Sequence, residues 1–363
     1  MPDLFTPLRL GALTVPNRIF LAPLTRCRAG VEHIPNPLMA EYYAQRASGG
    51  LLIAEATMIM EGNSAFHSEP GIYSQACVDG WKLITDAVHA KGGHIFLQIW
   101  HGGRACHPAL NNGAQTVSAS AIAIAGEVQT PEGKRPHVTP HALTIAEIPG
   151  IVAGFKKAAA NAKSAGFDGV EVHGANGYLI DQFLRDGANK RDDAYGGPRE
   201  NRARLLFEIL TAVSDVLGSD RVGLRSSPLN SYNDMVDSDP VGLATWLAGE
   251  LNAFNLAYWH VMRGDFAGKQ AGDIMTPSRA IYKGTLIGNM GYTPDEAQAA
   301  VAEGKVDAVA FGSPFLANPD LPERIKARAP LNAVNQSTVY GGGPEGYSDY
   351  PVLDLAATPA LAS

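Results

Sequence analysis

The sequence has few cysteines, no block of basic residues and no long apolar run, and each absence excludes a class of protein. Its 363 residues include three cysteines, Cys27, Cys77 and Cys106, which lie far apart and form no C-x-x-C pair. This spacing supports neither a disulfide framework, a structural zinc site nor an iron–sulfur cluster. We expect three ordinary reduced thiols and assign no role to Cys27.

Charge and hydropathy exclude two kinds of partner. The formal net charge is -7, the pI is near 5.8, and lysine and arginine are scattered along the chain. Neither nucleic acid nor an anionic membrane surface is therefore an expected partner. No stretch approaches the ~18 uninterrupted apolar residues of a spanning helix, and the start MPDLFTPLRLG lacks the features of a signal peptide. We expect a cytoplasmic protein, a monomer or a homodimer.

What the sequence does contain is a regular alternation of short apolar runs with amphipathic segments. Eight β-rich runs are apolar on both faces, which is typical of a parallel sheet covered by helices. They predict an α/β protein, a closed (β/α)8 TIM barrel forming a single domain over residues 1–363, with a doubly wound sheet as the alternative. The runs are 18–23, 51–55, 94–99, 169–173, 221–225, 256–262, 285–288 and 307–311. The helical patterns are 37–47, 78–90, 145–165, 200–217, 240–252, 293–303 and 319–328.

Two segments fall outside this alternation. Residues 101–144, after the third strand, are too long for a βα loop and rich in glycine, proline, serine and threonine, so we expect an excursion that caps the barrel mouth. Residues 330–363 predict an ordered C-terminal tail with a frayed end. The tail contains a G-x-G-x-x-G pattern at Gly341, Gly343 and Gly346, but no helical pattern follows it, so we interpret it as a turn.

Polar side chains follow the expected strand ends. In a (β/α)8 barrel the loops after the strands enclose one pocket, so these side chains are expected to meet. They are donors, one cation and aromatic groups rather than acids, which suits a planar polar ring with an anionic tail better than a divalent metal. The candidates are Thr25, Ala56, Gln98, Trp100, His173, Asn176, Tyr178, Arg225, Gly288, Asn289, Gly312 and Ser313.

The stretch GVEVHGANGYLIDQFL at 169–184 is the most informative of these strand ends. It begins as a buried strand and then presents His173, Asn176 and Tyr178 within six residues. Taken singly, each is more often structural: a satisfied histidine, a turn asparagine or a half-buried tyrosine. The joint spacing H-x-x-N-x-Y after the fourth strand favours a functional site.

Six stretches, in this order, resemble the old yellow enzyme family of FMN-dependent ene-reductases, in the branch of the pentaerythritol tetranitrate and N-ethylmaleimide reductases. The resemblance covers essentially the whole chain. The stretches are NRIFLAPLTR, LQIWHGGR, EIPGIVAGFKKAAANAKSAGFDGVEVHGANGYLIDQFL, NKRDDAYGGPRENRARL, AFGSPFLANPDLPERI and YGGGPEGYSDYP.

The resemblance implies an activity and three catalytic residues. His173 and Asn176 would donate hydrogen bonds to the oxygen of an α,β-unsaturated carbonyl, maleimide or nitro compound, so that the β-carbon accepts hydride from flavin N5. Tyr178 would deliver a proton to the α-carbon. The reductant would be NADPH or NADH, and no metal is required.

The resemblance also implies how the cofactor and substrate are held. Thr25 would bind flavin O4, Gln98 the pyrimidine edge and Arg225 the N1 and O2 side, with Pro23 and Ala56 in packing contact. The backbone of Asn289, Gly312 and Ser313 would bind phosphate. Ser313 stands where the family usually has an arginine, so we expect FMN to be retained but more easily lost. The substrate-lining positions would be Trp100, Phe66 and Tyr340.

Two other functions stay open from the sequence. One is a metal-dependent barrel hydrolase or lyase that uses His101, His107, Glu171 and His173. The other is a flavin-binding scaffold without turnover, which the missing arginine at Ser313 makes plausible.

Overall fold

A closed barrel of eight parallel strands forms the centre of the computed structural model, which describes residues 2–354. The strands neighbour one another in the order β10-β11-β12-β13-β14-β3-β4-β5. This closure confirms the predicted (β/α)8 barrel and excludes the doubly wound sheet, whose edges stay open. The barrel strands are β3 (Ile19–Leu21), β4 (Leu52–Met58), β5 (Ile95–Trp100), β10 (Gly169–Gly174), β11 (Val222–Ser226), β12 (Tyr258–Met262), β13 (Leu286–Asn289) and β14 (Ala308–Phe311).

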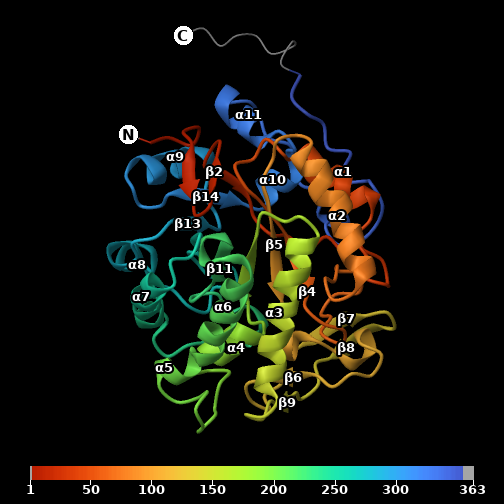
Figure 1. Ribbon diagram of the computed structural model, residues 1–363, viewed down its shortest axis with the longest axis vertical. Helices are drawn as coiled ribbons and strands as arrows, with labels where there is room; N and C mark the ends of the chain where they lie inside the picture. Colours follow the sequence, from red (N-terminus) through yellow and green to blue (C-terminus); the bar gives the residue numbers. More distant parts are fainter. Residues whose placement is uncertain (1, 355–363) are drawn as a thin grey trace.

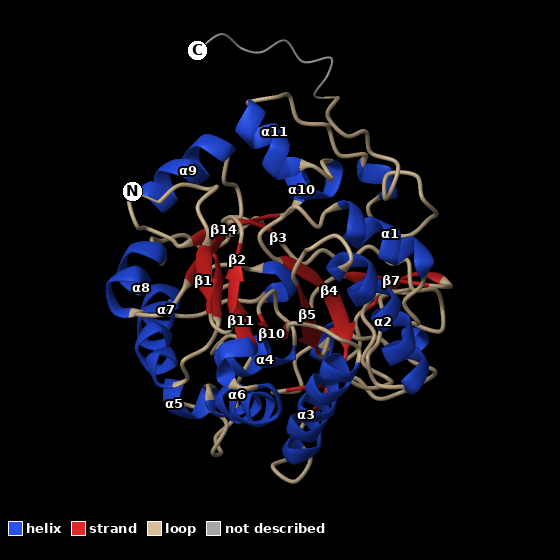
Figure 2. Ribbon diagram, turned by 45° about the horizontal axis from the view of Figure 1, so that its top comes forward, coloured by secondary structure: helices blue, strands red, loops and turns tan. Residues whose placement is uncertain are grey.

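Helices surround the barrel, as Figures 1 and 2 show. Several begin at a polar cap: the side chains of Asn36, Ser74 and Thr293 each accept a backbone N–H of the first turn that follows. The helix expected at 200–217 is divided at Ala203 into α5 and α6. The helices are α1 (Pro37–Gln45), α2 (Gln75–His89), α3 (Ile148–Ser164), α4 (Leu179–Leu184), α5 (Arg199–Arg202), α6 (Arg204–Leu217), α7 (Pro240–Glu250), α8 (Met275–Ile281), α9 (Pro294–Ala302), α10 (Ser313–Ala317) and α11 (Leu321–Ala327).

Short 3-10 helices occupy parts of the connections. They are η1 (Gly103–Ala105), η2 (Pro108–Leu110), η3 (Ser219–Arg221), η4 (Tyr232–Asp234), η5 (Leu251–Ala253) and η6 (Gln336–Thr338). Within residues 2–354 no helix combines the length and apolar character needed to cross a membrane.

A hairpin that the sequence did not predict closes one end of the barrel. Strands β1 (Leu8–Leu10) and β2 (Leu13–Val15) pair antiparallel, and the N–H of Ala12 donates to the carbonyl of Asp220. Leu10 and Val15 belong to one buried cluster with barrel side chains that include Phe20, Phe96, Tyr258 and Ile287. The hairpin therefore seals the end at which the strands begin and leaves the opposite end for a site.

The excursion at 101–144 lies between β5 and α3 and contains two small sheets. Strands β6 (Val117–Ser118) and β9 (His141–Ala142) pair parallel, and β7 (Glu127–Thr130) and β8 (Gly133–Pro136) form an antiparallel hairpin. These strands do not join the barrel, so the excursion interrupts the βα alternation.

Buried arginines hydrogen-bond to the C-terminal segment, residues 338–347. Arg26 donates to the carbonyls of Val339 and Gly346, and Arg28 donates to that of Thr338. Tyr347 is fully buried and stacks on Tyr42 with ring centroids 4.2 Å apart. The G-x-G-x-x-G pattern lies in this segment as turns without a following helix, which confirms that interpretation. The frayed end expected beyond residue 354 falls outside the described residues.

Candidate active site

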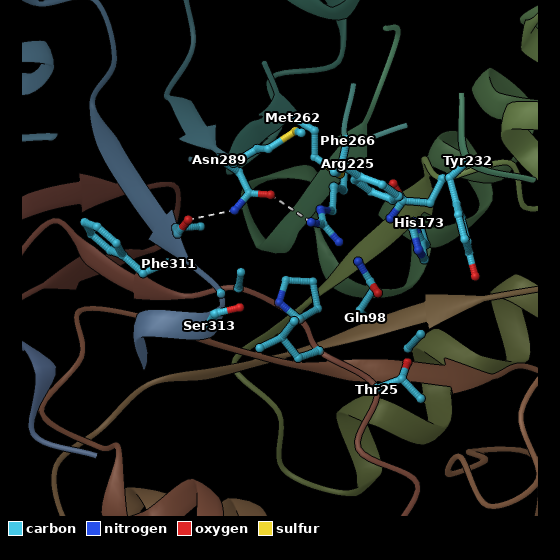
Figure 3. Close-up of a pocket in the computed structure, with 18 of the residues that line it drawn as sticks. Thr25, Gln98, His173, Arg225, Tyr232, Met262, Phe266, Asn289, Phe311 and Ser313 are labelled. Atoms are coloured by element: carbon cyan, nitrogen blue, oxygen red, sulfur yellow. Dashed lines mark hydrogen bonds between the residues drawn. The ribbon is translucent and has the colours of Figure 1, made fainter. Parts of the chain in front are cut away.

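A cavity of about 610 Å³ lies at the ends of the barrel strands opposite the β1–β2 hairpin. Figure 3 shows it extending from Ser313 and Asn289 at one end to His173 and Tyr232 at the other. Every strand-end candidate lines it except Trp100 and Gly288. The lining residues are Ala22, Pro23, Leu24, Thr25, Ala56, Phe66, Gln98, His173, Asn176, Tyr178, Arg225, Tyr232, Met262, Phe266, Asn289, Met290, Gly291, Tyr292, Ala310, Phe311, Gly312, Ser313, Pro314 and Tyr340.

His173, Asn176 and Tyr178 meet in this cavity because β10 ends between the first and the second. Asn176 adopts a left-handed conformation with φ 58, and Asn230 donates to its side-chain oxygen at 2.9 Å. The carboxamide NH2 of Asn176 has no acceptor within residues 2–354, so it can donate to a ligand. The rings of His173 and Tyr178 lie with centroids 5.2 Å apart.

Burial fixes the protonation states of two of these groups. Burial first, and the nearby Arg225 guanidinium second, hold the pKa of His173 well below its ordinary value, so the imidazole is neutral near pH 7. Its buried Nδ1 has no partner within residues 2–354. Burial likewise raises the pKa of Tyr178 well above its ordinary value, so the phenol keeps its proton. The site therefore presents neutral donors.

Arg225 is a buried cation that interacts electrostatically with Glu171 but forms no direct contact with it. Its guanidinium donates to Oδ1 of Asn289 at 2.8 Å and forms no ion pair with any carboxylate of residues 2–354 (Figure 3). Its Nε is buried and has no hydrogen-bond partner there. A buried charge is normally paired, so this position calls for an anionic or electron-rich ligand.

A chain of hydrogen bonds inside the barrel orients Gln98. Its Nε2 donates to Oε1 of Glu171 at 2.7 Å, and Oε2 of Glu171 lies 2.8 Å from Nδ1 of His260. Because Gln98 uses its NH2 on Glu171, its carbonyl oxygen remains to accept a hydrogen bond in the cavity. The sequence did not single out His260, since its strand looks uniformly apolar.

The residues of the alternative metal site do not converge. Glu171 is taken up by Gln98 and His260. The Nδ1 atoms of His101 and His107 accept the N–H groups of Gly103 and Ala109, within their own loop. Among residues 2–354 no group of three or more metal-binding side chains is placed to hold an ion.

Of the three aromatic residues expected to line the substrate site, two line the cavity and one lies behind its wall. Phe66 and Tyr340 line the cavity and stack with centroids 5.9 Å apart, and Tyr340 is 61% exposed. Trp100 is fully buried and lies behind the wall, with its ring 4.3 Å from that of Tyr178 in an edge-on contact. Trp100 therefore supports Tyr178 instead of facing the cavity directly.

Sequence reasoning missed several lining residues on long loops. Tyr232 and Phe266 follow β11 and β12, and their ring centroids lie 5.4 Å apart at the cavity edge. A second cavity of about 660 Å³ adjoins the first and shares Phe66, Tyr178, Tyr232 and Tyr340 with it. Aromatic residues in the loops after these two strands could have indicated a cavity wall. The local sequence does not determine whether such side chains point toward the cavity.

Comparison with known proteins identifies the family. Residues 3–332 match the model of the NADH:flavin oxidoreductase / NADH oxidase family, so the chain belongs to that family. Within it, the chain is of the old yellow enzyme type. The structure superposes on morphinone reductase with a TM-score of 0.94 at 45% identity, covering 99% and 98% of the two chains. It also superposes on the old yellow enzyme of Trypanosoma cruzi with a TM-score of 0.94 at 44% identity, covering 97% and 99%.

Curated relatives extend over the same length. A probable flavin mononucleotide-dependent alkene reductase of Leishmania infantum is 48% identical over 96% of both chains. The 12-oxophytodienoate reductase 2 of Arabidopsis thaliana is 43% identical over 98% of this chain and 96% of its own.

The residues present fit an FMN group. The cavity lies within the range of about 300–1,000 Å³ typical of cofactor sites. Arg225 supplies a buried cation whose Nε has no partner within residues 2–354, and Gln98 supplies an acceptor for a ring N–H. Thr25, Pro23 and Ala56 border the same space, and Gly312 and Ser313 border its far end.

Proposed function

We propose that the chain is an FMN-dependent ene-reductase that uses NADPH or NADH to reduce the activated C=C bond of α,β-unsaturated carbonyl, maleimide or nitro compounds. The names of the relatives, an alkene reductase and a 12-oxophytodienoate reductase, support alkene reduction. A relative, morphinone reductase, has been solved in complex with tetrahydroNAD, which supports a nicotinamide reductant. FMN, when bound, supplies the hydride.

Residues of the strand ends would hold the flavin. Thr25 would bind O4, Gln98 the pyrimidine edge, and Arg225 the N1 and O2 side, where a fixed cation stabilises negative charge. Pro23 and Ala56 would contribute packing. The backbone N–H groups of Gly312 and Ser313 would receive the phosphate, but not that of Asn289, which pairs with Met262 in the β12–β13 ladder.

The substrate would be held and protonated by the residues after β10. His173 and Asn176 donate to the carbonyl or nitro oxygen, which withdraws electrons from the double bond and makes its β-carbon electrophilic. Tyr178 gives its phenolic proton to the α-carbon. Phe66 and Tyr340 would bound the substrate, with Trp100 behind Tyr178.

One observation carries this proposal: three uncharged donors, His173, Asn176 and Tyr178, face one cavity without acceptors of their own in the described part of the chain. Buried donors are rarely left unpaired. A neutral oxygen acceptor on a substrate would satisfy two of them while the third remains available for proton transfer.

Two half-reactions, measured separately, test the assignment of Tyr178. In Tyr178→Phe, reduction by NADPH under anaerobic conditions should stay within about twofold of wild type, because that step needs no phenol. Reoxidation by 2-cyclohexenone should slow by roughly 10²–10⁴. Tyr195→Phe is the matched control, since Tyr195 is buried against Glu208 on α6, outside this cavity. If both half-reactions survive in Tyr178→Phe, Tyr178 is not the proton donor.

A further inference from the structure

Among residues 2–354, no cationic side chain lines the end of the cavity that would receive the FMN phosphate. Its walls are the loop Asn289, Met290, Gly291 and Tyr292 after β13 and the residues Gly312, Ser313 and Pro314 after β14. The backbone N–H groups of Gly291 and Tyr292 have no acceptor within residues 2–354, whereas the register of β13 with β14 directs that of Met290 toward Ala310. A phosphate here depends on backbone donors, and therefore on how firmly the 289–292 loop is held.

Arg263, the first residue after β12, holds this loop from outside the cavity. Its Nε donates to the carbonyl of Met290 at 2.8 Å, and its own backbone N–H donates to the carbonyl of Asn289 at 3.2 Å. Its guanidinium carbon lies 3.7 Å from the centroid of the Tyr292 ring. Arg263 thus contacts three of the four residues of the loop, yet does not line the cavity itself.

These contacts determine the direction in which backbone N–H groups of the loop point. In a trans peptide the C=O and the following N–H point in opposite directions. Since the carbonyl of Met290 faces the Arg263 side chain, the N–H of Gly291 faces away from Arg263. The N–H of Met290 points along the sheet toward Ala310. Met290 and Gly291 have φ 81 and φ 72, and a non-glycine residue held there requires surrounding contacts to keep it.

The charge of Arg263 is committed elsewhere. Both terminal nitrogens of its guanidinium donate to the carboxylate of Glu296, a forked pair with Nη2 3.0 Å from Oε2. Glu296 lies in the first turn of α9, whose N-terminal cap is Thr293. The pair therefore ties β12 to the start of α9 across the 289–292 loop.

We propose that Arg263 positions the 289–292 loop to bind the FMN phosphate. The backbone N–H groups of the loop would then bind the phosphate in place of a cationic side chain at position 313, where this chain has Ser313. Arg263 acts through the loop and does not bind the phosphate. This proposal rests on the proposed FMN site, and in it Arg263 determines the affinity for the phosphate part of FMN.

Comparison of FMN with riboflavin tests it, because riboflavin lacks the phosphate. Dissociation constants are measured by flavin-fluorescence titration of protein freed of flavin by dialysis. Arg263→Met should raise the Kd for FMN roughly tenfold, the value of a charged hydrogen bond, and leave the Kd for riboflavin within twofold. An equal rise for both flavins, or no rise for FMN, overturns the proposal. Wild-type protein that binds neither flavin refutes the FMN site itself.

Glu296→Gln separates action through the loop from direct binding. If Arg263 acts through the loop, weakening the pair should raise the Kd for FMN about threefold, as for a partly exposed ion pair. If Arg263 instead binds phosphate, releasing it from Glu296 should lower that Kd, which contradicts the proposal. Arg279→Met is the matched control. Arg279 pairs at 2.8 Å with Asp307, which lies just before β14 at the other end of the barrel. Loss of this pair should leave the Kd values for FMN and riboflavin unchanged.

Discussion

At the scale of single residues, the candidate site brings several unpaired polar groups to one cavity. His101 and His173 are both buried histidines, but His101 accepts a backbone N–H from its own loop while His173 has a buried nitrogen without a partner. Arg225 likewise differs from Arg263, which forms a direct ion pair with Glu296. Where such unpaired groups line a cavity, a ligand can complete their hydrogen bonding.

Ser313→Arg should tighten FMN binding. Ser313 is exposed at the phosphate end of the cavity, so a longer side chain can enter without displacing buried atoms. A charge-assisted bond to phosphate contributes about 1.5–3 kcal/mol, which predicts a Kd lower by a factor of ten or more. Fluorescence titration measures it, with Ser313→Ala as the control that adds no charge. An unchanged Kd in Ser313→Arg would refute the role of this position.

Glu69→Gln should gain stability relative to wild type as pH rises. Oε1 of Glu69 accepts the N–H groups of Ala65 and Phe66, and burial raises its pKa to about 7. Between pH 4.5 and 7 the folded carboxyl keeps a proton that the unfolded chain releases, so wild-type stability falls as pH rises through this window. Glutamine has no proton to lose. Urea unfolding of both proteins at pH 5 and pH 8 should show the difference growing by up to ~1.4 kcal/mol per unit within the window. A difference independent of pH contradicts this pKa.

The grouping of His173, Asn176 and Tyr178 could be predicted from the sequence, because all three lie at or just after the end of one strand. The position of Trp100 could not. Strand alternation places Trp100 on the same face as Gln98, but whether it reaches the cavity depends on Phe66 and Tyr178, which come from other loops and cover it.

At the scale of elements, the barrel strands were predictable because both of their faces are buried, which gives continuous apolar runs. The β1–β2 hairpin was not, since each strand has three residues and a burial pattern with one buried position. Helices α4, α8 and α10 have five to seven residues, too few for a helical period to emerge.

Shortening the β7–β8 hairpin should affect large substrates alone. Glu127, Val128 and Gln129 line the second cavity, and no residue of 101–144 lines the first. Replacing residues 128–135 by two glycines should leave FMN binding and the KM for 2-cyclohexenone within about twofold. The KM for an enone with a long substituent should change several-fold. Steady-state kinetics on both substrates measure this, and loss of FMN from the shortened protein would contradict it.

At the scale of the whole molecule, the C-terminal segment joins the barrel through contacts far apart in sequence. Arg26, Arg28 and Arg46 lie near the start of the chain and hydrogen-bond carbonyls between Phe315 and Tyr347. The aromatic residues of VYGGGPEGYSDYP indicated an ordered tail, but its partners could not be predicted, because isolated arginines give no periodic signal.

Tyr347→Ala should destabilise the whole domain. Its ring is fully buried against Tyr42, with the guanidinium of Arg28 4.6 Å from its centroid. Deleting such a ring costs about 3–5 kcal/mol. Urea unfolding followed by circular dichroism should show this loss. Tyr350→Ala, at a half-buried site nearby, should cost under about 1 kcal/mol. Equal losses in the two variants would contradict the prediction.

The visible spectrum of the purified protein tests the central claim most directly. A flavin across the barrel mouth predicts a yellow protein that absorbs near ~450 nm, loses that band on anaerobic addition of NADPH and regains it with 2-cyclohexenone. A protein that circular dichroism shows to be folded, yet is colourless and takes up no added FMN, would contradict the claim.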